Sequence, residues 1–156
     1  MKSELEKLLG NTPYILTLGN HDNKEAFYKG WFNKECNDPY NTVNEIGELR
    51  IISFDNSQYK NSDGFISKEQ YEWLENQLKG STKKDTILML HHHLIKYQFT
   101  TPAVSYDDKF ENMIRESSII GIFAGHTHHP FKGCFAEKLY FSTGSLSFIG
   151  YDESNG

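Results

Sequence analysis

All seven histidines of this 156-residue chain fall into three short clusters. One is His126-Thr127-His128-His129, which follows the apolar run 119–124 and a glycine. The second is His91-His92-His93, directly after an apolar run, and the third is the lone histidine in Gly19-Asn20-His21-Asp22. Imidazole nitrogens bind borderline divalent metals and transfer protons near neutral pH. These clusters are therefore the first candidates for a metal or catalytic site.

His126 and His128 have the spacing that places two side chains on the same side of an extended chain. At the ordinary rise of a strand their backbones would lie about 7 Å apart. Such a pair can converge on one metal ion, or each histidine can hold one ion of a pair about 4 Å apart. The alternative is a surface turn with merely polar histidines. The other two clusters favour a metal site, because α/β proteins bind ligands at the carboxyl ends of strands.

The Gly19-Asn20-His21-Asp22 segment adds two other kinds of chemical group. Asn20 offers a neutral carbonyl oxygen as a ligand, and histidine, asparagine and carboxylate together suit Zn, Mn, Fe, Ni or Co. His21 and Asp22 are adjacent on a loop tip and should point apart. We therefore expect His21 to face a substrate while Asp22 holds the backbone or an imidazole in place.

Composition limits the class of protein. With 156 residues and 37% hydrophobic residues, the chain is expected to form one domain over residues 1–156. A net charge of -5 without a basic run argues against duplex nucleic acid as a partner, and two cysteines cannot build a disulfide framework. No run approaches 18 apolar residues and residues 1–9 lack a signal sequence, so we expect a cytoplasmic protein without membrane contact.

The periodicity of apolar residues predicts an α/β protein with extra antiparallel strands at its C-terminal end. The start and stop signals place a capping box at Ser67 to Gln70. The predicted helices are 3–9, with Ser3 as its N-cap, 23–35, 67–79 and 107–116. The predicted strands are 14–18, 43–46, 49–55, 85–90, 119–124, 133–137 and 138–142.

Three motifs in this order, Gly19-Asn20-His21-Asp22, the strand-end His91 and Gly125-His126-Thr127-His128, resemble the last three motifs of the calcineurin-like metallophosphoesterases. The pattern between them, from Phe54-Asp55 to Leu74, is most similar to the class III cyclic-nucleotide phosphodiesterase branch. The resemblance covers nearly the whole chain. It implies a partial four-layer α/β/β/α sandwich and hydrolysis of small phosphoesters, nucleotides among them, by metal-bound hydroxide.

The resemblance also implies roles for individual residues. Asn20, His91 and His126 would bind one ion of a two-metal site, and His128 would bind the other. His21 would be catalytic, stabilising the charged transition state or protonating the leaving oxygen, and Asp22 would orient it. Strand alternation turns His92 away from His91, so His91 is the preferred ligand and His92 the alternative.

The family's first two motifs, Asp-x-His and Gly-Asp-x-x-Asp, occur nowhere in these 156 residues. The resemblance therefore implies an N-terminally truncated domain that lacks its first two strands and the carboxylates that neutralise a metal pair. We expect a metal-dependent phosphoesterase in a complete form, with the isolated chain inactive. The alternative is a catalytically inactive remnant that binds metal or a partner, pairs with a separate N-terminal half, or self-associates.

Overall fold

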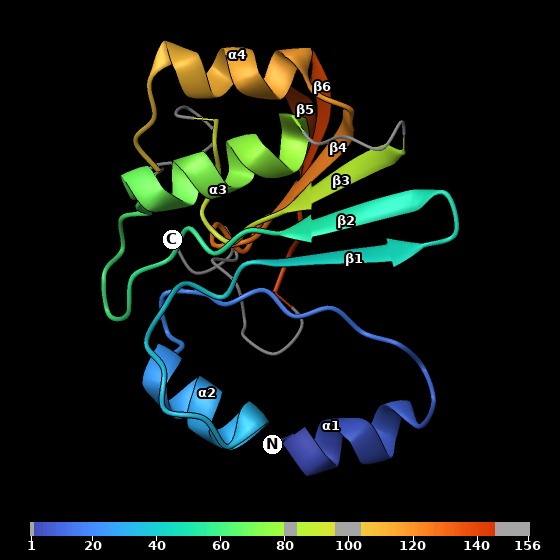
Figure 1. Cartoon of the computed structure of the whole chain (residues 1–156), viewed down its shortest axis with the longest axis vertical. Helices are drawn as coiled ribbons and strands as arrows, with labels where there is room; N and C mark the ends of the chain where they lie inside the picture. The colour runs from blue at the N-terminus through green and yellow to red at the C-terminus, as the bar shows by residue number, and fades with distance from the viewer. Residues whose placement is uncertain (1, 80–83, 96–103, 146–156) are drawn as a thin grey trace, which may run out of the picture.

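The computed structural model describes residues 2–79, 84–95 and 104–145. Within these ranges the elements follow in the order α1-α2-β1-β2-α3-β3-α4-β4-β5-β6 (Figure 1). The helices are α1 (Lys2–Leu9), α2 (Lys24–Phe32), α3 (Lys68–Lys79) and α4 (Asp108–Glu116). The strands are β1 (Thr42–Ile46), β2 (Leu49–Ser53), β3 (Asp85–Met89), β4 (Ile119–Ala124), β5 (Phe131–Phe135) and β6 (Lys138–Ser142). The predicted mixed α/β class is confirmed.

A single sheet with strand order β1-β2-β3-β4-β6-β5 organises the described residues. β2, β3, β4 and β6 run parallel, while β1 and β5 are antiparallel edge strands that form hairpins with β2 and β6. β3 and β4 are therefore neighbours in the middle of the sheet, and their carboxyl ends lie at the same edge. Because the second and third histidine clusters follow these two strands, the topology brings the clusters together.

Two helices, α3 and α4, cover one face of the sheet (Figure 1). The strand registers align one inward-facing residue from each parallel strand, in the row Ile52, Leu88, Ile122 and Tyr140. All four are fully buried, and they share a core with Leu74 of α3 and with Phe110 and Ile114 of α4. This core is one half of the expected sandwich, a sheet with its helical layer.

Local signals set several element boundaries. The capping box at α3 is confirmed, because the backbone N–H of Gln70 donates to Ser67 Oγ and that of Ser67 donates to Gln70 Oε1. Asp107 caps α4 by accepting a hydrogen bond from the Phe110 N–H. Each cap supplies partners for backbone groups that a helix end leaves unpaired.

The prediction of a strand over Tyr14 to Leu18 is wrong. The segment carries the apolar run of a buried strand, but a strand also needs a neighbour for its backbone hydrogen bonds, and none of the described strands pairs with it. The segment is hydrogen bonded to β2 through the Ser53 side chain, whose Oγ donates to the Leu16 carbonyl and lies 2.8 Å from Thr17 Oγ1.

The first two helices differ from the sequence prediction in detail. Ser3 lies inside α1 and is not its N-cap, because the helix already begins at Lys2. None of the residues of α1 is buried, so the predicted apolar face finds no core among the described residues. In α2, Trp31 is buried, whereas Phe32 is 47% exposed. α2 is shorter than predicted and ends at Asn33, which adopts the left-handed conformation of a C-cap.

No helix within the described residues has the length and apolar character needed to cross a bilayer.

Candidate metal centre

The backbone joins the loops that follow β3 and β4. The ladder between the two strands continues past their ends, since Leu90 N donates to the Phe123 carbonyl at 2.9 Å and Gly125 N donates to the His91 carbonyl at 2.9 Å. His91 and His126 are therefore presented from neighbouring backbones at one edge of the sheet. Their proximity follows from the topology of the sheet.

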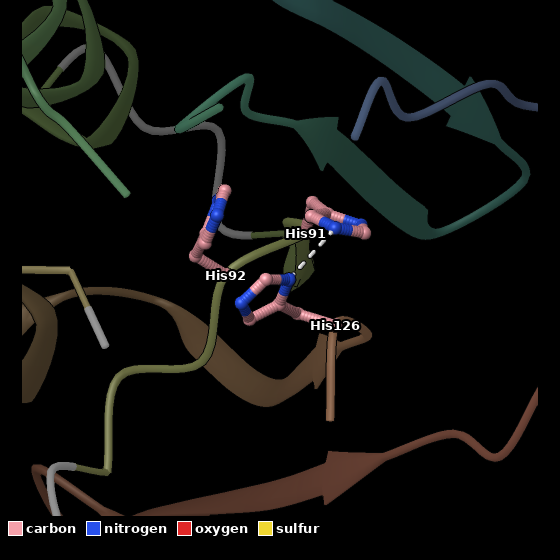
Figure 2. Close-up of side chains that lie close together, drawn as sticks. All are labelled: His91, His92 and His126. Atoms are coloured by element: carbon pink, nitrogen blue, oxygen red, sulfur yellow. Dashed lines mark hydrogen bonds between the residues drawn. The ribbon is translucent and has the colours of Figure 1, made fainter. Parts of the chain in front are cut away.

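Three imidazoles gather at this edge: His91, His92 and His126 (Figure 2). One nitrogen of each ring lies within 4.8 Å of one nitrogen of the other two. The closest approach joins His91 Nε2 to His126 Nδ1 at 3.3 Å, which is the dashed line in Figure 2. Donor atoms this close together could hold one ion after small side-chain rotations, since zinc binds histidine nitrogens at about 2.0 to 2.1 Å.

Asn20 reaches the same cluster from a distant part of the sequence. Its Oδ1 lies 3.0 Å from His91 Nε2, although 71 residues separate the two in sequence. Gly19 permits this approach, because a Cβ at that position would lie 2.7 Å from Cε1 of the His91 ring. Three of the four predicted metal ligands, Asn20, His91 and His126, therefore present donor atoms to one small volume.

His92 belongs to the cluster, contrary to the alternation predicted from an extended chain. β3 ends at Met89, and the chain bends through the histidines, so the alternation of a strand no longer applies. The His92 ring centroid lies 5.0 Å from that of His91 and 4.2 Å from that of His126. His92 is fully buried, and its neighbour His93, also fully buried, lies with its ring centroid 6.2 Å from that of His126.

The chain is not extended at His126-Thr127-His128, so the predicted strand-like geometry of this pair is wrong. His126 and His128 have left-handed φ values of 68° and 59°, a conformation that suits a tight loop. Thr127 N donates to the Gly125 carbonyl within this turn. The three-histidine cluster includes His126 but not His128, which is nevertheless close enough to lower the pKa of both His91 and His126.

His21 and Asp22, which follow Asn20 in the chain, are both exposed. A positive charge on His21 lowers the pKa of His91 and of His126, so its ring is near the cluster. Asp22 ties the loop to itself, because its Oδ2 accepts a hydrogen bond from Gly19 N at 2.8 Å and its own N–H donates to the Gly19 carbonyl at 3.0 Å. Asp22 thus holds the backbone of the loop, one of the two roles expected for it.

Burial and mutual repulsion keep the clustered imidazoles neutral. Burial is the largest cause that lowers the pKa of His91 to about 4, and His126, His21 and His128 add repulsion. Burial likewise lowers the pKa of His92 to about 3, with further repulsion from His126, His91 and His93. The pKa of His126 is lowered by burial and then by His128. Neutral imidazoles are the form that binds metals.

The donor set fits a borderline divalent ion. The buried ring nitrogens of His92 and Nε2 of His126 make no hydrogen bond with a described residue, although the Ser62 backbone lies near both rings. A buried polar atom without a partner is costly, and coordination would satisfy it. The cluster of three contains no carboxylate. Neutral nitrogen donors with one amide oxygen favour Zn, Ni, Co, Mn or Fe over Mg or Ca.

Sequence reasoning missed the participation of His92 and the contribution of the polar loop after β2. Asn56 is fully buried and hydrogen bonded to the backbone of His91 and His92. The one sequence signal for it is its position, three residues after the end of β2, because His91 and His126 similarly follow the ends of β3 and β4 by two residues.

Known proteins that are similar to this chain bear the names of phosphoester-cleaving enzymes. The profile of the family described as "Calcineurin-like phosphoesterase" matches residues 2–130. A "Probable cyclic nucleotide phosphodiesterase" of Rhodococcus erythropolis is 31% identical over 126 residues, covering 78% of this chain and 42% of that protein. A "Probable glycerophosphodiester phosphodiesterase" of Arcobacter nitrofigilis is 37% identical over 98 residues, covering 60% of this chain and 35% of that protein.

A "3',5'-cyclic adenosine monophosphate phosphodiesterase" of Escherichia coli is 31% identical over 81 residues, covering 52% of this chain and 29% of that protein. The chain spans less than half the length of each of these three relatives. The family profile, in contrast, extends from α1 through all three histidine clusters. The protein therefore belongs to the calcineurin-like phosphoesterase family.

Proposed function

We propose that a form of this protein that also carries the Asp-x-His and Gly-Asp-x-x-Asp motifs is a metal-dependent phosphodiesterase. Its substrates would be small phosphodiesters, with cyclic nucleotides and glycerophosphodiesters as the first classes to test, because relatives bear those names. The observation that carries the proposal is the convergence of Asn20 Oδ1 and His126 Nδ1 on His91 Nε2, at 3.0 and 3.3 Å.

In this proposal Asn20, His91 and His126 hold one divalent ion, which would polarise a phosphoryl oxygen and lower the pKa of water. His128 would hold a second ion together with groups from the two absent motifs. Mn, Fe, Zn, Ni and Co are the candidate metals. The neutral state of the buried imidazoles supports this role, since protons do not compete for their lone pairs at neutral pH.

His21 is the proposed general acid. It is exposed, so a substrate could reach it, and it lies near the metal ligands without belonging to their cluster. Its ring would stabilise charge on a phosphoryl oxygen or protonate the leaving oxygen. Asp22 holds the loop that presents the ring, through its hydrogen bond from Gly19 N.

A second candidate function is a metal-binding or partner-binding remnant without catalysis. The observation that favours it is the cluster of three neutral imidazoles without a carboxylate, which provides no bridge for a metal pair. Both candidates predict that the 156-residue chain alone is inactive, and they differ in the activity expected of a longer form that carries the two motifs.

The test compares hydrolysis of bis(p-nitrophenyl) phosphate in Mn or Zn by the 156-residue chain and by a longer form that includes the two motifs. We expect activity from the longer form and none from the chain alone. In the longer form, His21→Ala should lower turnover by about 10² to 10⁴-fold without emptying the metal site. Asn20→Ala, His91→Ala and His126→Ala should lower metal content and rate together.

His129→Ala, a change in the same loop outside the three-histidine cluster, is the matched control. Its rate and metal content should stay at the unmodified level. Full activity in His21→Ala would remove the catalytic role of that residue. Inactivity of the longer form toward every phosphodiester tested, with metal bound, would favour the remnant.

A further inference from the structure

Asn56 is a fully buried side chain at the end of β2 that is bonded to the histidine loop rather than to its own strand. Its Oδ1 accepts hydrogen bonds from the backbone N–H groups of His91, at 3.2 Å, and His92, at 3.0 Å. Its Nδ2 donates to the carbonyl of His92 at 2.9 Å. A carboxamide can pair with two N–H groups and a carbonyl at once, because it carries both an acceptor and donors.

The preceding residue, Asp55, is also buried and is paired with Lys24, which lies close in sequence to the loop that carries Asn20. Its buried carboxylate lies 3.1 Å from Lys24 Nζ, and it also accepts from Tyr40 N at 2.9 Å and from Ser57 Oγ at 2.7 Å. Lys24 is the first residue of α2, two positions after Asp22. The ion pair therefore fixes the start of α2 and, with it, the exit of the loop that carries Asn20.

The segment after Asp55 adds a direct bond to that loop, since Lys60 N donates to the Asn20 carbonyl at 2.7 Å. Lys24 Nζ donates in turn to the Ser57 carbonyl at 2.7 Å. Residues 55–60 are thus bonded on one side to the Asn20 loop and on the other to the His91–His92 loop. Residues 55–60 therefore hold in place two loops that are far apart in sequence.

We propose that Asp55 and Asn56 are positioning residues for the metal centre: Asn56 sets the backbone of His91 and His92, and Asp55, through Lys24, sets the loop of Asn20. The inference rests on the proposed function only in taking Asn20, His91 and His126 as metal ligands. Neither residue is itself a ligand, because hydrogen bonds already occupy the Asn56 amide and the Asp55 carboxylate.

Asn56→Ala tests the proposed positioning role of Asn56. Groups that orient metal ligands through hydrogen bonds, without binding the metal themselves, typically contribute about 10 to 100-fold to metal affinity. The Zn²⁺ affinity of the 156-residue chain should therefore fall by that factor in Asn56→Ala. Calorimetric titration at neutral pH, below the melting temperature of each variant, measures it. Asn61→Ala is the control, because Asn61 lies in the same loop and bonds to Gln58 and Asp63 instead. Its zinc affinity should be unchanged.

Hydrogen exchange of the metal-free chain provides a readout independent of zinc. Asn56→Ala should speed exchange at the His91 and His92 amides, and Asn61→Ala should not. Asn56→Asp should restore part of the protection, because a carboxylate still accepts from both amides but cannot donate to the His92 carbonyl. A purely structural role would instead lower the melting temperature and speed exchange throughout the core, with zinc affinity of the folded variant unchanged.

The role of Asp55 is tested with a double variant, since Lys24→Met alone would leave the buried Asp55 carboxylate without its partner. The double variant Lys24→Met/Asp55→Asn removes both charges. It should speed exchange at the Gly19 and Asp22 amides, which are bonded within the Asn20 loop, and it should lower zinc affinity. Unchanged exchange at those two amides and unchanged zinc affinity would overturn this half of the proposal.

For Asn56, unmodified zinc affinity together with unmodified exchange at His91 and His92 in Asn56→Ala would overturn its role. If the parent chain bound no zinc, the ligand assignment of the proposed function would fail, and the exchange rates would still decide whether Asn56 sets the loop. Failure of the two proposals is therefore distinguishable.

Discussion

Asn20 and His91, 71 residues apart in sequence, meet side chain to side chain, with Oδ1 and Nε2 separated by 3.0 Å. The contact joins a loop before α2 to the end of a central strand. It requires Gly19, whose missing side chain leaves room for the His91 ring. The effect of single substitutions near this pair on metal binding therefore tests the geometry of the candidate metal centre.

The composition of the centre predicts its metal preference. We expect the 156-residue chain to bind Zn or Ni in preference to Mg, because its donors are imidazole nitrogens and an amide oxygen. Calorimetric titration at neutral pH with each ion measures the order. His126→Ala should weaken zinc binding, with His129→Ala as control. Tighter binding of Mg, or zinc binding indifferent to His126→Ala, would contradict the ligand assignment.

Gly19→Ala should disturb the centre by sterics alone. The added Cβ would lie 2.7 Å from Cε1 of His91, so the ring or the Gly19 loop must shift. We expect zinc affinity to fall by about 10-fold or more, in the range typical of lost ligand orientation. Calorimetry and a thermal melt check affinity and folding together.

Gly30→Ala is the matched control, because a Cβ there meets nothing within 4 Å and the position lies inside α2. Replacing a helical glycine by alanine should stabilise the chain by up to about 1 kcal/mol and leave zinc binding unchanged. Equal zinc affinity in the two variants would show that the His91 ring tolerates displacement.

The stability of the metal-free chain should decline in acid. The pKa of His91 is lowered to about 4 and that of His92 to about 3, whereas both histidines in an unfolded chain titrate near 6.5. The unfolded chain therefore takes up protons first as the pH falls. The stabilising contribution is complete above pH 6.5 and is lost progressively toward about pH 4 and then 3.

Thermal melts with a chelator between pH 7 and pH 4 measure this decline. Carboxylates also titrate toward the lower end, so His92→Leu serves as the comparison. The variant should lose less stability over the same interval, because one neutral buried imidazole is gone. Parallel pH profiles for the two proteins would mean that His92 does not contribute.

One face of the sheet should promote self-association. Leu139 on β6 is 54% exposed and Phe123 on β4 is 37% exposed, on the face opposite the buried Ile122 and Tyr140. The ring of Phe123 stacks on Phe141 at 5.2 Å, which makes the apolar surface continuous. Exposed apolar surface of this kind favours association.

Leu139→Lys should shift the chain toward monomer without lowering its melting temperature by much, since the position is exposed. Sedimentation velocity over a range of concentrations measures the shift, and Leu8→Lys, at an exposed position of α1, is the control. A parent chain that is monomeric at every concentration would refute the prediction.

The sequence alone determined the features that depend on neighbours in the chain. Apolar runs fixed most strands, and the capping residues Ser67 and Gln70 fixed the start of α3, because both signals act over a few residues. The position of His91 and His126 just after two strands also indicated a shared site. Parallel strands place their carboxyl ends at one edge, so this inference needed only the order of the elements.

The tertiary structure decided what depends on partners distant in sequence. Tyr14 to Leu18 has the pattern of a strand but no strand beside it, and hydrogen-bond partners cannot be read from one segment. His92 joins the cluster and His126 adopts a left-handed φ of 68° because the chain bends where the strands end, so strand alternation no longer applies. The role of Asn56 is visible only through backbone groups 35 and 36 residues away. Side-chain direction in loops is set by such distant contacts, which local pattern does not encode.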